Sequence, residues 1–264
     1  MLGWSINLFR VFGIQLAIHA SFLLLLAYFG YDGWKQGGLP GAIWSIGLII
    51  LFFVCVVLHE LGHCLTARRY GVKIPRILLM PIGGMAEFDR IPRKPSQELL
   101  ITIAGPAVNF VLAAILLPLV WRGIFSEEAV PEFSLVNLLA ELLKANLGMG
   151  IFNLLPVFPM DGGRILRALL AMKLPYLRAT FWAVRIGRPL ALAFAAVAAF
   201  HFENLILCAL FLFIFWAGGA EYRYTLRRDE QERIWAERSR PIQEIEPSAV
   251  EPGVPPLLGQ SGPG

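Results

Sequence analysis

The sequence has 264 residues, of which 57% are hydrophobic and 16% are charged, and its mean hydropathy is +0.64. Because soluble domains are about 45–50% apolar and about 25% charged, this composition excludes an ordinary soluble enzyme and indicates a protein that crosses a membrane several times. The formal net charge of +4 fits basic loops at one membrane face, and we expect no nucleic-acid partner.

Six apolar segments are candidates for membrane-spanning helices, each of which needs about 20 residues to cross the hydrocarbon core. In chain order they cover about residues 14–29, 43–67, 99–121, 135–155, 181–200 and 205–220. The predicted fold is an all-α membrane protein with about six transmembrane helices, within residues 1–220. Residues 221–240 are expected to form a charged juxtamembrane cytoplasmic helix, and residues 241–264 a disordered tail.

The positions of Lys and Arg predict how these segments are oriented. They are concentrated between the second and third segments, between the fourth and fifth, and after the sixth, whereas the opposite loops carry little more than Lys35 and Arg122. The positive-inside rule therefore predicts an integral multi-pass protein of the cell membrane with both termini in the cytoplasm. The far end of the second segment then lies near the cytoplasmic face.

The connection between the second and third segments has the pattern of a β-hairpin. An apolar run at 77–82 is followed by Gly83 and Gly84, a turn signal, and then by a second short run at 85–88. Non-helical backbone at membrane depth is tolerated only against protein or a wet cavity. We expect this hairpin to be re-entrant or to pack beside the helices at the membrane; the alternative is a surface loop with an apolar stretch.

An H-E-x-x-H motif lies near the end of the second apolar segment. On a helix, His59 and His63 are four residues apart and share one face, so two neutral imidazoles can bind one Zn²⁺. Glu60 lies about 100° round the helix axis, close enough to act on water at that metal. The motif alone does not distinguish a zinc site from a buried polar helix.

A catalytic zinc usually has three protein ligands, so a third donor is needed elsewhere in the chain. Asp161 is the candidate, because it follows the fourth apolar segment at the same predicted membrane depth as His63. Acidic residues at such depth are costly and therefore informative. The alternative is that Asp161 caps a helix that starts near Gly162; the matched depth favours the ligand.

These motifs together resemble the site-2 protease family of intramembrane zinc metalloproteases, in a compact form without a PDZ-like or CBS domain. The resemblance covers about residues 10–220, and further matching stretches lie at 18–22, 83–84, 104–109 and 186–188. It implies one Zn²⁺ per chain, held by His59, His63 and Asp161, with Glu60 as general base.

The resemblance also implies roles for Asn109 and Asn153 near the scissile carbonyl or the metal ligands. The alternative for both is hydrogen bonding between packed helices. A substrate helix must partly unwind before its peptide bond can be attacked. We expect the hairpin with Gly83 and Gly84 to clamp the unwound stretch by strand addition.

The activity implied is endoproteolysis of the transmembrane segments of membrane-protein substrates, as in regulated intramembrane proteolysis. Substrates of this class include a membrane-tethered transcription factor, an anti-sigma factor or a signal-peptide remnant, all presented from the lipid bilayer. Two alternatives are a multi-pass ion or metal transporter and an inactive homologue that only binds membrane helices. Glu60 beside a two-histidine pair favours the protease, and the sequence carries no signal for an oligomeric state.

Overall fold

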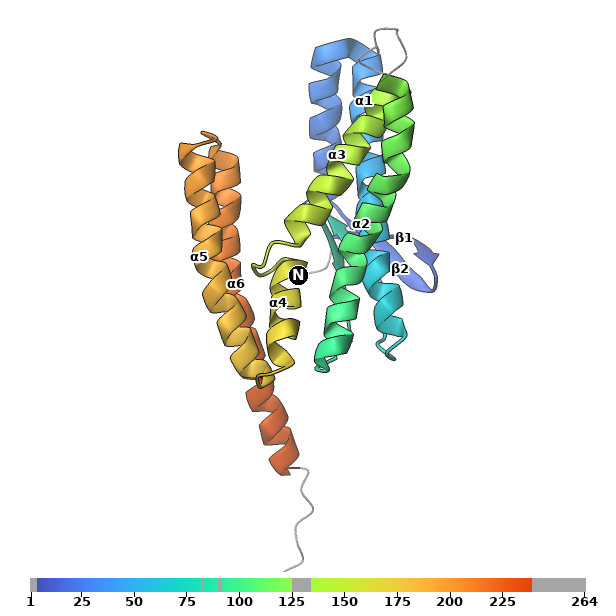
Figure 1. Cartoon of the computed structure of the whole chain (residues 1–264). Coiled ribbons are helices and arrows are strands. Elements are labelled where there is room, and N and C mark those ends of the chain that lie inside the picture. The colour runs from blue at the N-terminus through green and yellow to red at the C-terminus, as the bar shows by residue number, and fades with distance from the viewer. Residues whose placement is uncertain (1–3, 82, 90–91, 125–133, 239–264) are drawn as a thin grey trace, which may run out of the picture. The chain divides into compact units, whose positions relative to one another are not determined.

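The computed structural model describes residues 4–81, 83–89, 92–124 and 134–238 (Figure 1). The elements up to Thr225 form one compact unit, which contains the predicted site. In chain order the elements are β1 (Ser5–Val11), β2 (Ile14–His19), α1 (Ser21–Arg68), β3 (Arg76–Met80), β4 (Gly83–Ala86), α2 (Pro95–Ile124), α3 (Leu135–Asn153), α4 (Asp161–Ala171), α5 (Tyr176–Phe200) and α6 (Leu205–Arg238).

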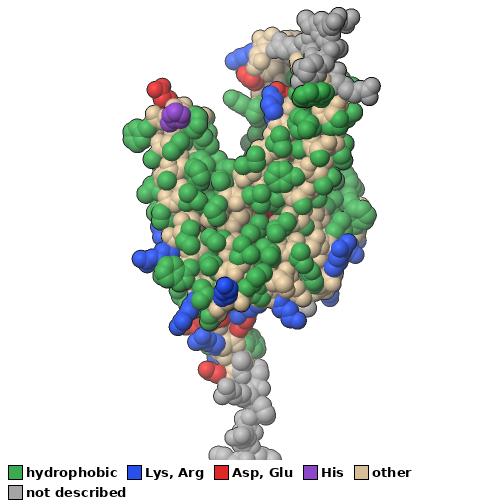
Figure 2. All heavy atoms as spheres, viewed as in Figure 1, with side chains coloured by type: hydrophobic (Ala, Val, Ile, Leu, Met, Phe, Trp, Pro, Cys, Tyr) green, Lys and Arg blue, Asp and Glu red, His purple; other side chains and the backbone are tan. Residues whose placement is uncertain are grey.

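Among the described residues, five helices are long and apolar enough to cross a membrane: α1, α2, α3, α5 and α6. Helix α1 consists of two helical arms, because the backbone leaves the helical conformation at Gly37 and Gly38. Figure 1 shows the arms folded back on each other, and a Cβ at Gly33 would touch the backbone of Gly41. With these arms counted separately, the segments match the about six predicted helices. Figure 2 shows a wide hydrophobic surface over them.

The predicted first helix is wrong at its beginning. Residues 14–19 form strand β2, and the helix starts only at Ser21. Phe12 and Gly13 turn the chain with positive φ values of 49° and 80°, so that β1 and β2 pair as an antiparallel hairpin. The apolar side chains of Ile14 and Leu16 are buried in a cluster formed by the sheet and helix α1 rather than by lipid. Tertiary pairing thus outweighs the local hydropathy of this stretch.

The predicted hairpin at 77–88 is confirmed as β3 and β4, which belong to a four-stranded sheet in the order β1-β2-β3-β4. Strand β2 pairs in parallel with β3, and β3 pairs antiparallel with β4. The buried Ile77 and Leu79 pack in one cluster with Val56 and Leu61 of α1. The sheet therefore lies against the arm of α1 that carries the H-E-x-x-H motif, and the surface-loop alternative is wrong.

The remaining helices follow the prediction with shifted ends. Segments 99–121, 135–155 and 181–200 correspond to α2, α3 and α5. The sixth apolar segment and the charged helix predicted at 221–240 are continuous in α6. The short α4 was predicted only as a helix start near Gly162. The predicted disordered tail, 241–264, lies outside the described residues.

A buried ion cluster fastens α4 to α2. Arg167 of α4 is 2% exposed and donates to Glu98 Oε1 of α2 from Nε (3.0 Å) and Nη2 (2.5 Å), and to Glu221 Oε1 of α6 from Nη1 (2.7 Å). Its guanidinium lies 5.0 Å from the ring centre of Phe158 and 5.1 Å from that of Tyr176. Burial counts against the charged guanidinium, but the Glu98 carboxylate raises the pKa of Arg167 above its ordinary value.

Replacing Arg167 with Met is expected to lower the free energy of unfolding by about 3–5 kcal/mol, because Glu98 would remain as an uncompensated buried charge. Unfolding of the full chain in detergent micelles, followed by tryptophan fluorescence, measures this loss. The double variant E98L/R167M removes both charges and should regain at least about half of it. A double variant no more stable than R167M would show that the cost comes from lost packing instead.

Candidate metal centre

Two histidines near the end of α1 present matching nitrogen atoms to one small volume. His59 and His63 are each 4% exposed, and their Nε2 atoms lie 3.1 Å apart. The Nδ1 atom of His59 is 2.5 Å from Asn109 Oδ1, and that of His63 is 2.7 Å from the Ile101 carbonyl oxygen. Because both oxygens accept, each Nδ1 carries the proton and each Nε2 keeps its lone pair for a metal.

Asp161 reaches these nitrogens from the first turn of α4. Its Oδ2 lies 3.3 Å from His59 Nε2 and 3.1 Å from His63 Nε2. The residue at the N-cap is Met160, and no side chain caps the helix there, so the capping alternative is wrong. A Cβ at Gly162 would collide with the carbonyl oxygens of Leu154 and Leu155, so a glycine there lets the preceding loop fold over the start of α4.

The three donor atoms fit a zinc ion. A tetrahedral ion with bonds of about 2.0–2.1 Å places its ligand atoms about 3.3 Å apart, close to the 3.1–3.3 Å between His59 Nε2, His63 Nε2 and Asp161 Oδ2. Asp161 Oδ2 is buried without a hydrogen-bond donor among the described residues, as expected of an atom that binds a cation. Gly105 of α2 leaves room beside the donors: a Cβ there would collide with His63 Nε2 and lie 2.8 Å from His59 Nε2.

Glu60 lies outside this donor group, against strand β4. A Cβ at Gly84 would be 2.7 Å from Glu60 Cγ and 3.3 Å from Glu60 Cδ. The carboxylate is nevertheless close enough to interact electrostatically with His59, His63 and Asp161. Gly83 and Gly84, predicted as part of a substrate clamp, are the first two residues of β4. The strand, the glutamate and the donor atoms thus converge on one region.

The two asparagines predicted at the site differ in position. Asn109 is fully buried and contacts His59 directly. Asn153 instead donates to the Met149 carbonyl oxygen of its own helix, at 3.0 Å. Sequence reasoning missed Asn146 of α3, which is fully buried and accepts a hydrogen bond from Asn109. A polar amide inside an apolar segment was the available signal for it.

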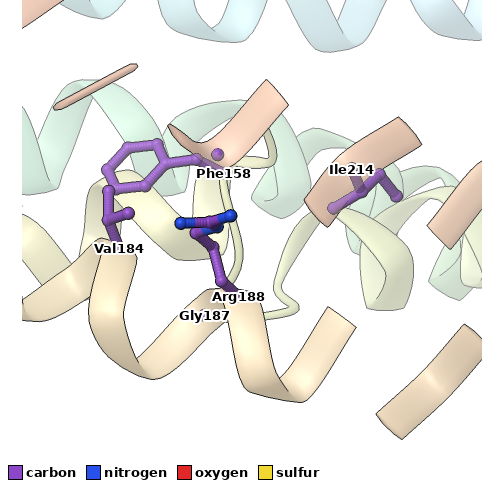
Figure 3. A pocket seen from close by; sticks show the side chains of 6 residues that line it. Phe158, Val184, Gly187, Arg188 and Ile214 are labelled. Carbon is purple, nitrogen blue, oxygen red and sulfur yellow. The ribbon is translucent and has the colours of Figure 1, made fainter. Parts of the chain in front are cut away.

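Figure 3 shows residues that line a narrow pocket between α5, α6 and the loop before α4, which has no room for a water-sized molecule. Its lining residues are Phe158, Val184, Gly187, Arg188, Ile214 and Gly218. The Arg188 guanidinium lies below Phe158 in this view and 4.2 Å from the ring centre of Phe215. None of the three donor residues lines this pocket, so it is distinct from the metal centre.

Comparison with known proteins connects this site to a family. The model of peptidase family M50 matches residues 47–124 and 123–194, more than half of the chain and all three donor residues. The chain belongs to peptidase family M50. The predicted resemblance to the site-2 proteases is thereby confirmed, and the M50 chain is an integral membrane protein with a site that fits zinc.

The chain is also similar to individual zinc metalloproteases. The chain is 42% identical to a zinc metalloprotease of Methanocaldococcus jannaschii, over 84% of this chain and 62% of that protein. It is 30% identical to a putative zinc metalloprotease, Rip3, of Mycobacterium tuberculosis, over 87% of this chain and 59% of that protein. It thus spans about six-tenths of the length of these two relatives. A solved site-2 protease of Methanocaldococcus jannaschii matches its fold with a TM-score of 0.58 and 40% identity, over 83% of this chain and 95% of that chain.

Proposed function

We propose that this chain is an intramembrane zinc endopeptidase that hydrolyses a peptide bond in or near the transmembrane segment of a membrane-protein substrate. The observation that carries this proposal is the set of three buried donor atoms, spaced for one tetrahedral ion, of which two lie on the membrane-spanning helix α1 and the third on α4. The distribution of Lys and Arg supports a site near the cytoplasmic face and cytoplasmic termini. A membrane-tethered regulator or a signal-peptide remnant is the proposed class of substrate.

The division of labour among the residues follows from their positions. When bound by His59, His63 and Asp161, zinc supplies Lewis acidity to a water molecule and to the peptide carbonyl. Glu60 accepts the proton of the attacking water and returns it to the leaving amine. Asn109 holds the His59 ring in the tautomer that binds metal. In this geometry Asn109 acts through the ligand rather than on the substrate.

The free edge of the sheet supports a role in holding the unwound substrate. Among the described residues, β4 is one of the two edge strands of the sheet, and β1 is the other. The Glu87 N–H donates to the Arg76 carbonyl oxygen at 3.0 Å, so Glu87 points its backbone groups toward β3. In an antiparallel pair, successive residues point their N–H and C=O groups alternately toward and away from the neighbouring strand. Gly84 and Ala86 therefore point their N–H and C=O groups away from β3. Because Gly84 also contacts Glu60, a substrate strand added at this edge would pass beside the proposed base.

Replacing Ala86 with Pro should slow cleavage about threefold to tenfold without loss of zinc. The proline removes one outward N–H, and a backbone hydrogen bond contributes about 0.5–1.5 kcal/mol; the bonds to β3 are unaffected. Rates are measured on a single-span substrate in proteoliposomes. A86V, which keeps the N–H, is the matched control and should cleave at the wild-type rate. Equal rates for A86P and A86V would contradict strand addition at this edge.

The test of the function itself is cleavage by the purified chain in proteoliposomes that contain a panel of single-span substrates. Zinc-dependent cleavage, lost on treatment with a chelator and restored by added zinc, is the expected result. A transporter would instead move metal ions across sealed vesicles and leave every substrate intact. An inactive homologue would retain substrates in pull-down experiments without cutting them. Either outcome would overturn the proposed function.

A further inference from the structure

We propose that Asn146 is a positioning residue of the metal centre, which sets the orientation of the Asn109 amide and thereby the tautomer of His59. This inference rests on the proposed zinc site and extends it to a third helix. Asn146 and Asn109 are both fully buried, on α3 and α2, while His59 lies on α1. The three side chains form one continuous series of hydrogen bonds across the three helices.

The contacts of Asn146 determine which group donates in each of these hydrogen bonds. Asn146 Nδ2 lies 2.8 Å from the carbonyl oxygen of Leu142, which can only accept, so the Asn146 amide must present its NH₂ group to that oxygen. The same NH₂ group lies 3.3 Å from Cys55 Sγ. Asn146 Oδ1 consequently faces Asn109 and accepts from Asn109 Nδ2 at 2.9 Å.

The orientation of Asn146 in turn determines the hydrogen bond between Asn109 and His59. With its NH₂ group given to Asn146, Asn109 presents Oδ1 to His59 Nδ1 at 2.5 Å. An acceptor at that position requires the proton on Nδ1, which leaves the Nε2 lone pair directed at Asp161 and His63. A reversed Asn109 amide would require the opposite tautomer, with a proton on the nitrogen that should bind zinc.

The alternative role for Asn146 is a hydrogen bond that simply holds α2 and α3 together. The two roles differ in what a carboxylate at position 109 would do. Both oxygens of a carboxylate accept, so an aspartate there needs no neighbour to orient it. If Asn146 orients Asn109, the loss of zinc affinity on removing Asn146 should depend on whether residue 109 is asparagine or aspartate. If Asn146 only holds the two helices together, the loss should be the same with either residue at position 109.

The experiment measures zinc affinity of the purified full chain in detergent micelles, by competition with a chromophoric chelator. N146L should weaken zinc binding by up to about 10- to 100-fold, the usual effect of losing the hydrogen-bond partner of a metal ligand, because a reoriented Asn109 amide no longer accepts from His59. N109D places a carboxylate oxygen against the Asn146 Oδ1 acceptor, so N109D/N146L should bind zinc at least as tightly as N109D. The control T180V removes a hydrogen bond that another fully buried residue donates to an i−4 carbonyl, and it should leave the affinity unchanged.

Equal affinities for N146L and T180V would overturn the inference, as would an equal loss from N146L in both backgrounds. If N146L does not yield folded chain, N146A replaces it with the same expectations, because a methyl group neither donates nor accepts. A wild-type chain that binds no zinc would overturn the proposed function together with this inference. Zinc binding by wild type with an unaffected N146L would overturn the inference alone.

Discussion

Replacing Glu60 with Gln is expected to abolish cleavage while the chain keeps its zinc. The amide is nearly the same size as the carboxylate but cannot accept a proton from water. General acid–base catalysis contributes about 10²–10⁴-fold, and one carboxylate is proposed to act as both base and acid here, so we expect a loss of at least about 10³-fold. Cleavage rates in proteoliposomes and metal content by mass spectrometry provide the two measurements.

The zinc content of E60Q is the control, because Glu60 lies outside the group of three donor atoms. About one zinc per chain should remain in both wild type and E60Q. Equal cleavage by the two proteins would refute the assignment of Glu60 as general base. Loss of zinc from E60Q would show instead that this carboxylate helps to hold the metal.

Replacing Asp161 with Ala is expected to abolish cleavage by the opposite route, through loss of the metal. Only the two histidines would remain as ligands, whereas a catalytic zinc usually has three protein ligands. Loss of a hydrogen-bond partner of a metal ligand lowers metal affinity about 10- to 100-fold. Loss of the ligand Asp161 itself should lower zinc affinity by more than that. Chelator competition on the purified chain measures it, and D32A, at an exposed acid in the first arm of α1, is the control.

Wild-type zinc affinity in D161A would mean that the contacts of Asp161 with the two histidines reflect ion pairing rather than shared coordination. E60Q and D161A are informative as a pair, since both should lose cleavage and only D161A should lose zinc. A chain that transports metal would show no such separation, because cleavage would be absent from wild type as well.

The sequence was sufficient to predict the parts of the site that depend on local spacing. A four-residue interval on a helix places His59 and His63 on one face whatever the rest of the fold does. Asp161 was found through the cost of an acid at membrane depth. The resemblance added Asn109, which the structure places on His59.

The features that were missed depend on contacts between distant segments. Strand β2 exists because Gln15 to Ile18 pair with Arg76 to Leu79, and a local window of hydropathy contains no sign of that partner. From the sequence, Arg167 counts only as one of the basic residues between the fourth and fifth segments. In the structure it is buried and forms an ion pair with Glu98 of another helix. Asn146 gains its importance only from the orientation of Asn109, which no spacing along one helix predicts.

The parallel pairing of β2 with β3 has a consequence for the order in which the chain is assembled. Between the two strands lies the whole of α1, so β2 and β3 can pair only after all of that helix has been synthesised. Such non-local pairing forms late, because the ends of a long connection must first be brought together. Strands β3 and β4 can form their own hairpin earlier, but that hairpin takes its place in the four-stranded sheet only when β2 pairs with β3. The proposed docking edge would therefore reach its final position only in this late step.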